Sequence, residues 1–293
     1  MSADFIAIDM HVHVPTEQWL DGSLGGGYLD SAQDYFRSQV ARRSVEQLAH
    51  EYGQLGVLAV VLAWDAETGT GRPRLPNEVV AAMVREHPGT FIGFASVDPH
   101  KGQVAVDELR RAHDELGLVG LKLHPSLQAF RPDDPAYEAL WSAAEELRMP
   151  CVVHTGTSGI GAGRPGGMGV LLDFARPIHL DAVAARHPGL TLIAAHFGWP
   201  WHLELIAMCL HKSNLFFDLS GWAPRYLPPE IVREISGRLR DQVLFGSDYP
   251  FLSPERCLKE IELLDLPAEN RIKLLSGNAS RVLRLNQSPS TQA

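Results

Sequence analysis

The segment FIAIDMHVHVPTEQW, residues 5–19, decides the fold, because it begins as a buried strand and ends in histidines instead of glycines. An open doubly wound sheet usually carries a glycine-rich phosphate loop directly after its first strand. Here the apolar run leads into His11 and His13. Side chains alternate faces along a strand, so these two imidazoles are expected to point the same way. They either share a metal ion or form ordinary hydrogen bonds.

Seven further apolar runs follow, and most are nearly continuous in Val, Ile, Leu, Phe and Ala, which is typical of strands buried on both faces. The eight predicted strands are 5–11, 56–64, 91–98, 118–124, 151–155, 191–197, 215–220 and 243–248. Amphipathic segments separate most of them, so the chain predicts a parallel sheet. Eight strands close a (β/α)8 barrel, which typically needs ~250 residues. We therefore predict a single TIM barrel over 1–285, with the active site at the C-terminal ends of the strands.

Local signals mark several of the intervening helices. Ser44 and Gln47 have capping-box spacing, and the helical patterns that precede 87–89 and 187–189 both stop at His-Pro-Gly. Residues 14–43 form a polar insertion that is expected to fold over the barrel mouth. The last residues, 286–293, are predicted to be a disordered tail.

Composition narrows the classes of partner. The chain has 293 residues and a net charge of −9, which argues against nucleic acid and anionic membranes. Three separated cysteines suggest neither a disulfide framework nor a cysteine zinc site. No signal peptide or membrane span is apparent. We expect a cytoplasmic protein with a small-molecule substrate, and we leave assembly into a homo-oligomer open.

Polar side chains gather where the predicted strands end. Five of the thirteen histidines occupy such positions, together with one lysine and one aspartate: His11, His13, Lys122, His124, His154, His196 and Asp248. The carboxyl ends of barrel strands meet at one mouth. Imidazole and carboxylate suit a divalent ion such as Zn²⁺, which lowers the pKa of bound water and leaves a carboxylate to take its proton. The pattern therefore favours a metal site over unrelated core histidines.

In these residues the chain resembles the amidohydrolase superfamily, and most closely the amidohydrolase family 2 branch that includes aminocarboxymuconate-semialdehyde decarboxylase. The matching segments are DMHVHVP, GLKLHP, VVHTG, HLDAVAARHPGLTLIAAHFGWPW and LFGSDYPF, in the order of the family and from the first strand to the last. The resemblance implies one divalent metal, expected to be zinc, bound by His11, His13, His154 and Asp248. It also implies that Asp248 acts as general base and that His196 stabilises or transfers charge.

The same resemblance assigns substrate contacts to Lys122 and His124 in the fourth strand. In other superfamily branches a lysine of that strand is carbamylated and bridges two metals, and this alternative for Lys122 stays open. The family 2 pattern favours a single metal.

Two loops contain further candidate substrate contacts. Residues 155–169 hold seven glycines and one cation, Arg164, which is expected to pin a mobile loop to an anionic group of the substrate. A solvated connection is the alternative. Trp222 and Arg225 follow the seventh strand and are expected to complete the pocket wall, although a tryptophan there also suits barrel packing.

Two activities follow from this pattern. The first is hydrolysis, in which metal-activated water attacks a carbonyl of a small cyclic or aromatic carboxylate-bearing substrate, Asp248 takes the proton and His196 stabilises the oxyanion. The alternative is non-oxidative decarboxylation of an aromatic or muconate-like acid. A binding module without catalysis is a distant third, because every expected ligand is present.

Overall fold

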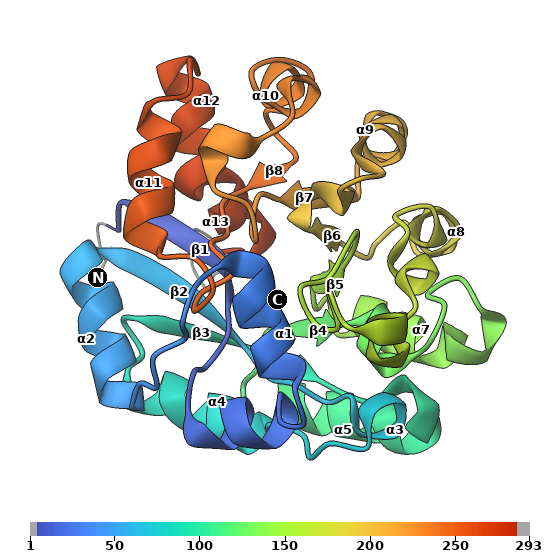
Figure 1. Cartoon of the computed structure of the whole chain (residues 1–293). Coiled ribbons are helices and arrows are strands. Elements are labelled where there is room, and N and C mark those ends of the chain that lie inside the picture. The colour runs from blue at the N-terminus through green and yellow to red at the C-terminus, as the bar shows by residue number, and fades with distance from the viewer. Residues whose placement is uncertain (1–4, 286–293) are drawn as a thin grey trace, which may run out of the picture.

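The computed structural model describes residues 5–285 and contains one sheet of eight parallel strands, whose order in space follows the chain. In Figure 1 the strands surround the centre of the molecule and helices lie outside them. The strands are β1 Ala7–Val12, β2 Val57–Leu62, β3 Phe91–Ser96, β4 Gly120–Leu123, β5 Cys151–His154, β6 Leu192–Ala195, β7 Leu215–Asp218 and β8 Val243–Leu244. The predicted (β/α)8 barrel is confirmed.

Backbone hydrogen bonds between β1 and the segment after β8 close the barrel. The amide of Met10 donates to the carbonyl of Phe245 at 2.9 Å, and the amide of Asp248 donates to the carbonyl of His11 at 3.0 Å. This closure brings the first predicted site histidine beside the last predicted site residue, although 237 positions separate them in the chain.

The last strand is shorter than predicted: 243–248 was expected, and only Val243–Leu244 pairs with β7. The amide of Phe245 turns away to donate to the carbonyl of Leu274 at 3.0 Å. Asp248 itself has a left-handed backbone, with φ of 68°. The polar end of this segment is therefore a turn instead of a strand.

Helices surround the barrel, and α1 lies over its mouth. They are α1 Tyr28–Phe36, α2 Val45–Leu55, α3 Glu67–Thr70, α4 Asn77–Glu86, α5 Gln103–Asp114, α6 Pro125–Gln128, α7 Glu138–Glu146, α8 His179–Arg186, α9 His202–His211, α10 Pro229–Ile235, α11 Pro254–Glu262, α12 Ala268–Ile272 and α13 Asn278–Val282. The predicted capping box is present: the Ser44 side chain accepts from the amide of Gln47, and the Gln47 side chain accepts from the amide of Ser44. None of the described helices is long and apolar enough to cross a membrane.

The core has two layers, as strands buried on both faces require. Inside the barrel lie Ile8, Val60 and Phe94, and the wider layer between strands and helices includes Val61 and Trp141. A Cβ on Gly120 would come within 2.3 Å of the Phe94 ring, so this glycine makes room for a bulky interior side chain.

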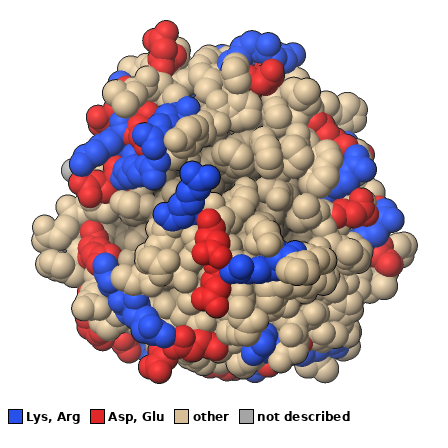
Figure 2. Space-filling view, in the orientation of Figure 1, with Lys and Arg blue, Asp and Glu red and all other residues tan. Residues whose placement is uncertain are grey.

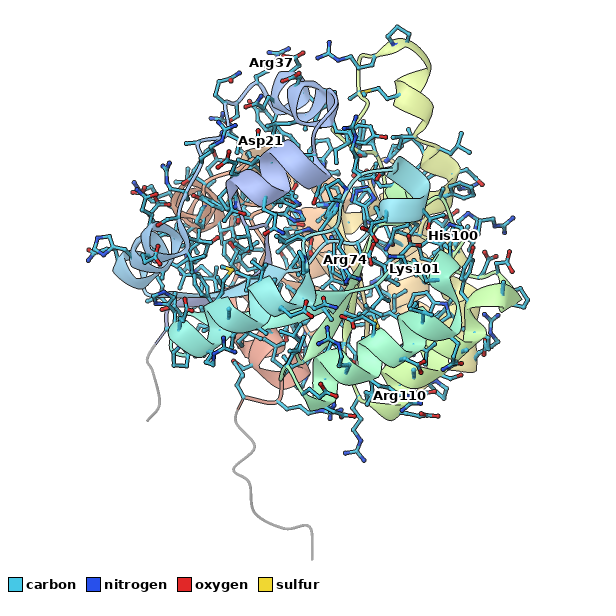
Figure 3. The ribbon with its side chains drawn as sticks, turned by 90° about the horizontal axis from the view of Figure 1, so that it is seen from below. Asp21, Arg37, Arg74, His100, Lys101 and Arg110 are labelled. Carbon is cyan, nitrogen blue, oxygen red and sulfur yellow. The ribbon has the colours of Figure 1, made fainter. Side chains whose placement is uncertain are left out.

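The insertion 14–43 covers the barrel mouth, as predicted. It forms a π-helical turn, Gln18–Ser23, followed by α1, which lies in front of the strands in Figure 1. In the side view of Figure 3, Asp21 and Arg37 mark this end of the barrel and Arg110 lies at the opposite end. The predicted tail, 286–293, lies outside the described residues.

Candidate active site

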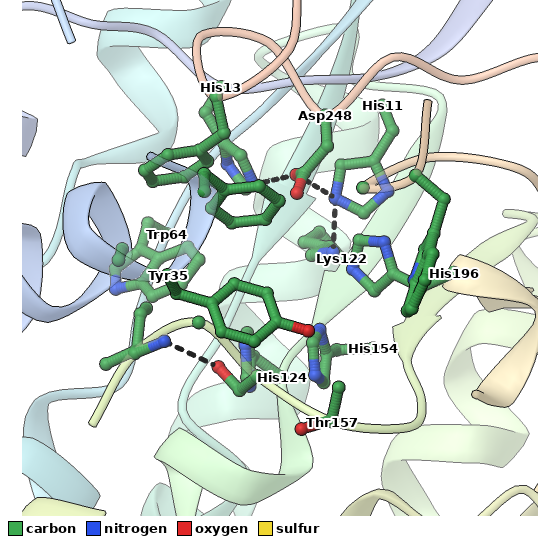
Figure 4. Close-up of a pocket in the computed structure, with 18 of the residues that line it drawn as sticks. His11, His13, Tyr35, Trp64, Lys122, His124, His154, Thr157, His196 and Asp248 are labelled. Carbon is green, nitrogen blue, oxygen red and sulfur yellow. Dashed lines mark hydrogen bonds and ion pairs between the residues drawn. The ribbon is translucent and has the colours of Figure 1, made fainter. Parts of the chain in front are cut away.

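A pocket opens at the carboxyl ends of the strands, and the predicted strand-end residues line it. Its lining comprises His11, His13, Trp19, Ala32, Tyr35, Phe36, Trp64, Lys122, His124, His154, Thr157, Ser158, Gly159, Ile160, His196, Gly221, Trp222, Asp248 and Phe251. All five predicted histidines, Lys122 and Asp248 are therefore brought together, and Figure 4 shows them around one space. In Figure 2 the same face is hollowed near its centre, and acidic and basic side chains are interspersed over it.

Asp248 lies between the two histidines of the first strand. Its Oδ1 is 3.3 Å from Nε2 of His13 and 3.5 Å from Nε2 of His11. Burial alone would raise the pKa of this carboxyl. The hydrogen bond from His13 and the nearby imidazoles outweigh burial and hold the pKa of Asp248 well below its usual range. Asp248 is consequently an ionised carboxylate.

His11 is fully buried and has a partner on each ring nitrogen. Nδ1 lies 3.2 Å from Oδ2 of Asp218, and Nε2 lies 2.9 Å from Nζ of Lys122. Burial lowers the pKa of His11 well below its usual value, and the Lys122 ammonium lowers it further. Burial also lowers the pKa of Lys122 to about 8, partly opposed by Asp248 and Asp218.

His196 occupies a tight turn directly after β6. Its φ is 62°, in the left-handed region. Nδ1 lies 3.0 Å from the carbonyl oxygen of Ser220, so Nε2 is the ring atom that can meet a substrate. Gly221, with φ of 74°, leaves the room that this ring needs, because a Cβ there would approach Nδ1 to 2.8 Å.

His124 and His154 lie across the pocket from the first strand and stack on each other, with ring centroids 3.7 Å apart. Burial lowers the pKa of both well below the usual value, so both are neutral. Among the described residues, Nδ1 of His124 and Nε2 of His154 have no hydrogen-bond partner although they are buried. An unpartnered buried ring nitrogen calls for a ligand.

The donor set fits a divalent ion. Neutral imidazoles beside an ionised carboxylate are the ligands that such ions prefer. Three of these residues, His11, His196 and Asp248, offer ligand atoms within 4.8 Å of one another. Of the four predicted ligands, His11 and Asp248 belong to this trio, and His13 and His154 do not. The third member, His196, was predicted to be catalytic. The described residues thus form a possible metal site, and the identity of its ligands stays a prediction.

The five histidines, Lys122 and Asp248 form the polar floor of the pocket, and aromatic side chains form its walls. Trp19 stacks on His13 with ring centroids 4.8 Å apart, and Phe36 of α1 stacks on Phe251 at 4.9 Å. Trp222 lines the pocket and packs against Trp199 at 4.9 Å, so it both contacts the space and contributes to packing. Aromatic walls of this kind suit a planar ring.

The two predicted arginine contacts lie elsewhere. Arg164 is 2.6 Å from Asp34 of α1, and Arg225 lies 3.7 Å from Glu260 with its guanidinium over the Tyr226 ring. Neither is among the residues that line the pocket. The 155–169 loop does reach it, through residues 157–160.

Sequence reasoning missed the residues that support the floor. Asp218 ends β7 and Ser220 follows two residues later. Both are fully buried and contact the site histidines. The signal was available, because Asp218 is a carboxylate at a strand end like Asp248. Tyr35 and Phe36 were missed because no pattern in the insertion shows which side chains turn inward.

The chain matches the model of the amidohydrolase family, Amidohydro_2, over residues 8–285 and belongs to that family. The gamma-resorcylate decarboxylase of Rhodococcus jostii (strain RHA1) is 23% identical over 332 residues, which cover 96% of this chain and 99% of the relative.

Solved structures agree on the fold. An uncharacterized TIM-barrel protein from Bordetella bronchiseptica superposes with a TM-score of 0.80 at 22% identity, covering 95% of this chain and 98% of the other. A dihydroxybenzoic acid decarboxylase from Polaromonas sp. JS666, with bound manganese and the inhibitor 2-nitroresorcinol, gives a TM-score of 0.71 at 18% identity, covering 97% and 98%.

Proposed function

We propose that this protein is a metal-dependent decarboxylase that removes CO2 from a hydroxylated aromatic acid without an organic cofactor. The observation that carries the proposal is the pocket itself: aromatic walls surround a floor of histidines, one carboxylate and one lysine. The similarity to decarboxylases of dihydroxybenzoates supports this alternative over the hydrolase expected from the strand-end residues.

The substrate carboxylate needs a cation in a buried pocket. Apart from histidines, Lys122 is the one basic side chain among the described residues that line the space. Trp19, Phe36 and Trp222 would hold the ring flat beside it. A divalent ion bound by the histidines and Asp248 would add Lewis-acid polarisation of the substrate oxygens.

The reaction places one proton on the ring carbon that carries the carboxylate. The electron pair of the breaking carbon–carbon bond then returns to the ring as CO2 leaves. Asp248 is held ionised, so it is suited to bind the ion. His196 is suited to deliver the proton: Nε2 takes up a proton from solvent and passes it to carbon, while Nδ1 stays on the Ser220 carbonyl.

The proposed ion is divalent, and manganese is named for the Polaromonas relative where zinc was expected here. Metal-free protein should be loaded with Mn²⁺ or Zn²⁺ in parallel, so that the activity itself identifies the ion.

A substrate panel tests the proposal. Purified metal-loaded protein is given hydroxybenzoates in one series and aromatic lactones, esters and amides in the other. We expect CO2 release from the first series and no hydrolysis in the second. Hydrolysis without CO2 release would overturn the proposal and restore the hydrolase.

A further inference from the structure

We propose that Asp218, the last residue of β7, is a positioning residue that sets the tautomer of His11. In that tautomer the proton lies on Nδ1, and the lone pair of Nε2 is presented to the pocket, where it can bind a metal ion. The inference follows from hydrogen-bond geometry, and only its consequence for turnover rests on the proposed function.

The two carboxylate oxygens of Asp218 have different partners. Oδ1 accepts from the backbone amides of His196 at 2.9 Å and Ser220 at 3.0 Å, and also from the Ser220 hydroxyl. Oδ2 faces Nδ1 of His11 at 3.2 Å. A carboxylate has no hydrogen to donate, so the proton in this contact belongs to His11.

The opposite side of the His11 ring leads to the same assignment. Nε2 lies 2.9 Å from Nζ of Lys122, and an ammonium group only donates. The Asp248 carboxylate is farther from Nε2, at 3.5 Å, so the closer contact with Lys122 makes Nε2 the acceptor and leaves the proton on Nδ1. Both contacts are buried, with Lys122 1% exposed and Asp218 0% exposed, so water does not compete for them.

His196 provides an internal control. Its Nδ1 faces the backbone carbonyl of Ser220 at 3.0 Å and the Ser220 hydroxyl at 2.9 Å. A carbonyl cannot donate, so His196 also carries its proton on Nδ1. This assignment does not depend on the charge of Asp218.

The substitution Asp218→Asn is expected to change the tautomer of His11 and to leave that of His196 unchanged. The two backbone amides that meet Oδ1 require an acceptor there, so the asparagine must place its oxygen at that position. Its NH2 group then faces Nδ1 of His11, where a donor meets a donor unless the proton moves to Nε2. Oδ1 of Asp248, 3.5 Å from Nε2, can accept the proton there. We expect His11 to change tautomer and His196 to keep its own.

Nitrogen-15 NMR of the imidazoles in full-length, metal-free protein reads the tautomers directly. The variants His11→Gln and His196→Gln assign the two sets of signals. In the wild type we expect both histidines to be protonated on Nδ1. In Asp218→Asn we expect only His11 to be protonated on Nε2. A wild-type His11 protonated on Nε2 would overturn the proposal even if the variant did not fold, and so would an unchanged His11 in a folded variant.

Binding of Mn²⁺, followed by the paramagnetic resonance of the free ion, gives a second readout without substrate. Loss of a partner that orients a ligating histidine typically weakens metal binding 10–100-fold, and we expect a loss in that range for Asp218→Asn. Asp65→Asn is the matched control, because Asp65 is also buried but contacts Lys101 and no imidazole. An unchanged affinity in Asp218→Asn would contradict the proposal. Since neither readout uses turnover, a failed decarboxylase assay leaves both results interpretable.

Discussion

His196, assigned to proton transfer, and Asp248, assigned to the metal ion, both have left-handed backbones, with φ of 62° and 68°. For residues other than glycine this conformation costs about 1 kcal/mol or more, and it persists only where the surroundings impose it. Here the backbone amide of His196 is bound by Asp218, and that of Asp248 by the carbonyl of His11. The strain therefore serves to aim both side chains into the pocket.

Replacing His196 tests its role in proton transfer. We expect His196→Asn to lower kcat by roughly 100–1000-fold, by analogy with the loss of one charge-stabilising group, and to retain the metal. Kinetics and elemental analysis of the same sample check both. Loss of metal would make His196 a ligand, which its closeness to His11 and Asp248 permits. An unchanged kcat would make it structural.

The metal assignment has its own test at the residue scale. The double variant His11→Ala, His13→Ala should lose metal and activity together, because it removes two neutral imidazoles that meet Asp248. Elemental analysis after dialysis against a metal-free buffer is the measurement. If the folded variant keeps a full equivalent of metal, these histidines are not ligands.

The sequence predicts the elements well where one strong pattern specifies them. Apolar runs located all eight strands, and the rule that barrel sites lie at strand ends located the floor of the pocket. What could not be predicted depends on contacts between distant segments. Arg164 was assigned to the substrate, but its side chain meets Asp34, a residue 130 positions away, and no local pattern specifies such a pairing. Asp218, by contrast, was overlooked although its place at the end of a predicted strand was visible in the sequence.

Two contacts join α1 to the 155–169 loop, and they give a prediction at the element scale. The ion pair of Arg164 with Asp34 is largely exposed, and such pairs contribute less than ~1 kcal/mol. A second contact, from the amide of Gly161 to the hydroxyl of Ser31 at 2.8 Å, is buried and remains. We expect Arg164→Ala to change KM less than about fivefold, equally for anionic substrates and neutral analogues. A loss confined to anionic substrates would show that Arg164 reaches the substrate.

Across the whole molecule, the pocket places polar groups where folding alone would prefer apolar ones. Five histidines, Lys122 and Asp248 are buried at the end of a barrel whose interior is otherwise packed with aliphatic and aromatic side chains. Burying a charge lowers the free energy of unfolding unless nearby groups compensate for the lost hydration. The site is therefore expected to lower stability in return for reactivity.

Lys122→Met tests this cost through its pH dependence. The pKa of Lys122 is lowered to about 8, from 10.5 in the unfolded chain. The penalty is fully present below pH 8 and declines as pH rises toward 10.5, because the unfolded chain keeps the proton that the folded protein has lost. From pH 7 to pH 9 we expect the wild type to gain roughly 1 kcal/mol relative to Lys122→Met. Urea denaturation of the metal-free proteins measures the difference, and a constant difference would contradict the lowered pKa.

The central claim is that the protein removes CO2 from a hydroxylated aromatic acid. The fate of the carboxylate carbon tests this claim most directly. Metal-loaded protein is incubated in D2O with 2,6-dihydroxybenzoate labelled with ¹³C in the carboxyl group, and Asp248→Asn serves as the inactive control. We predict one ¹³CO2 released for each deuterium that appears on the ring carbon formerly bearing the carboxylate. Turnover that leaves the labelled carboxylate on the product while water cleaves another bond would contradict the account.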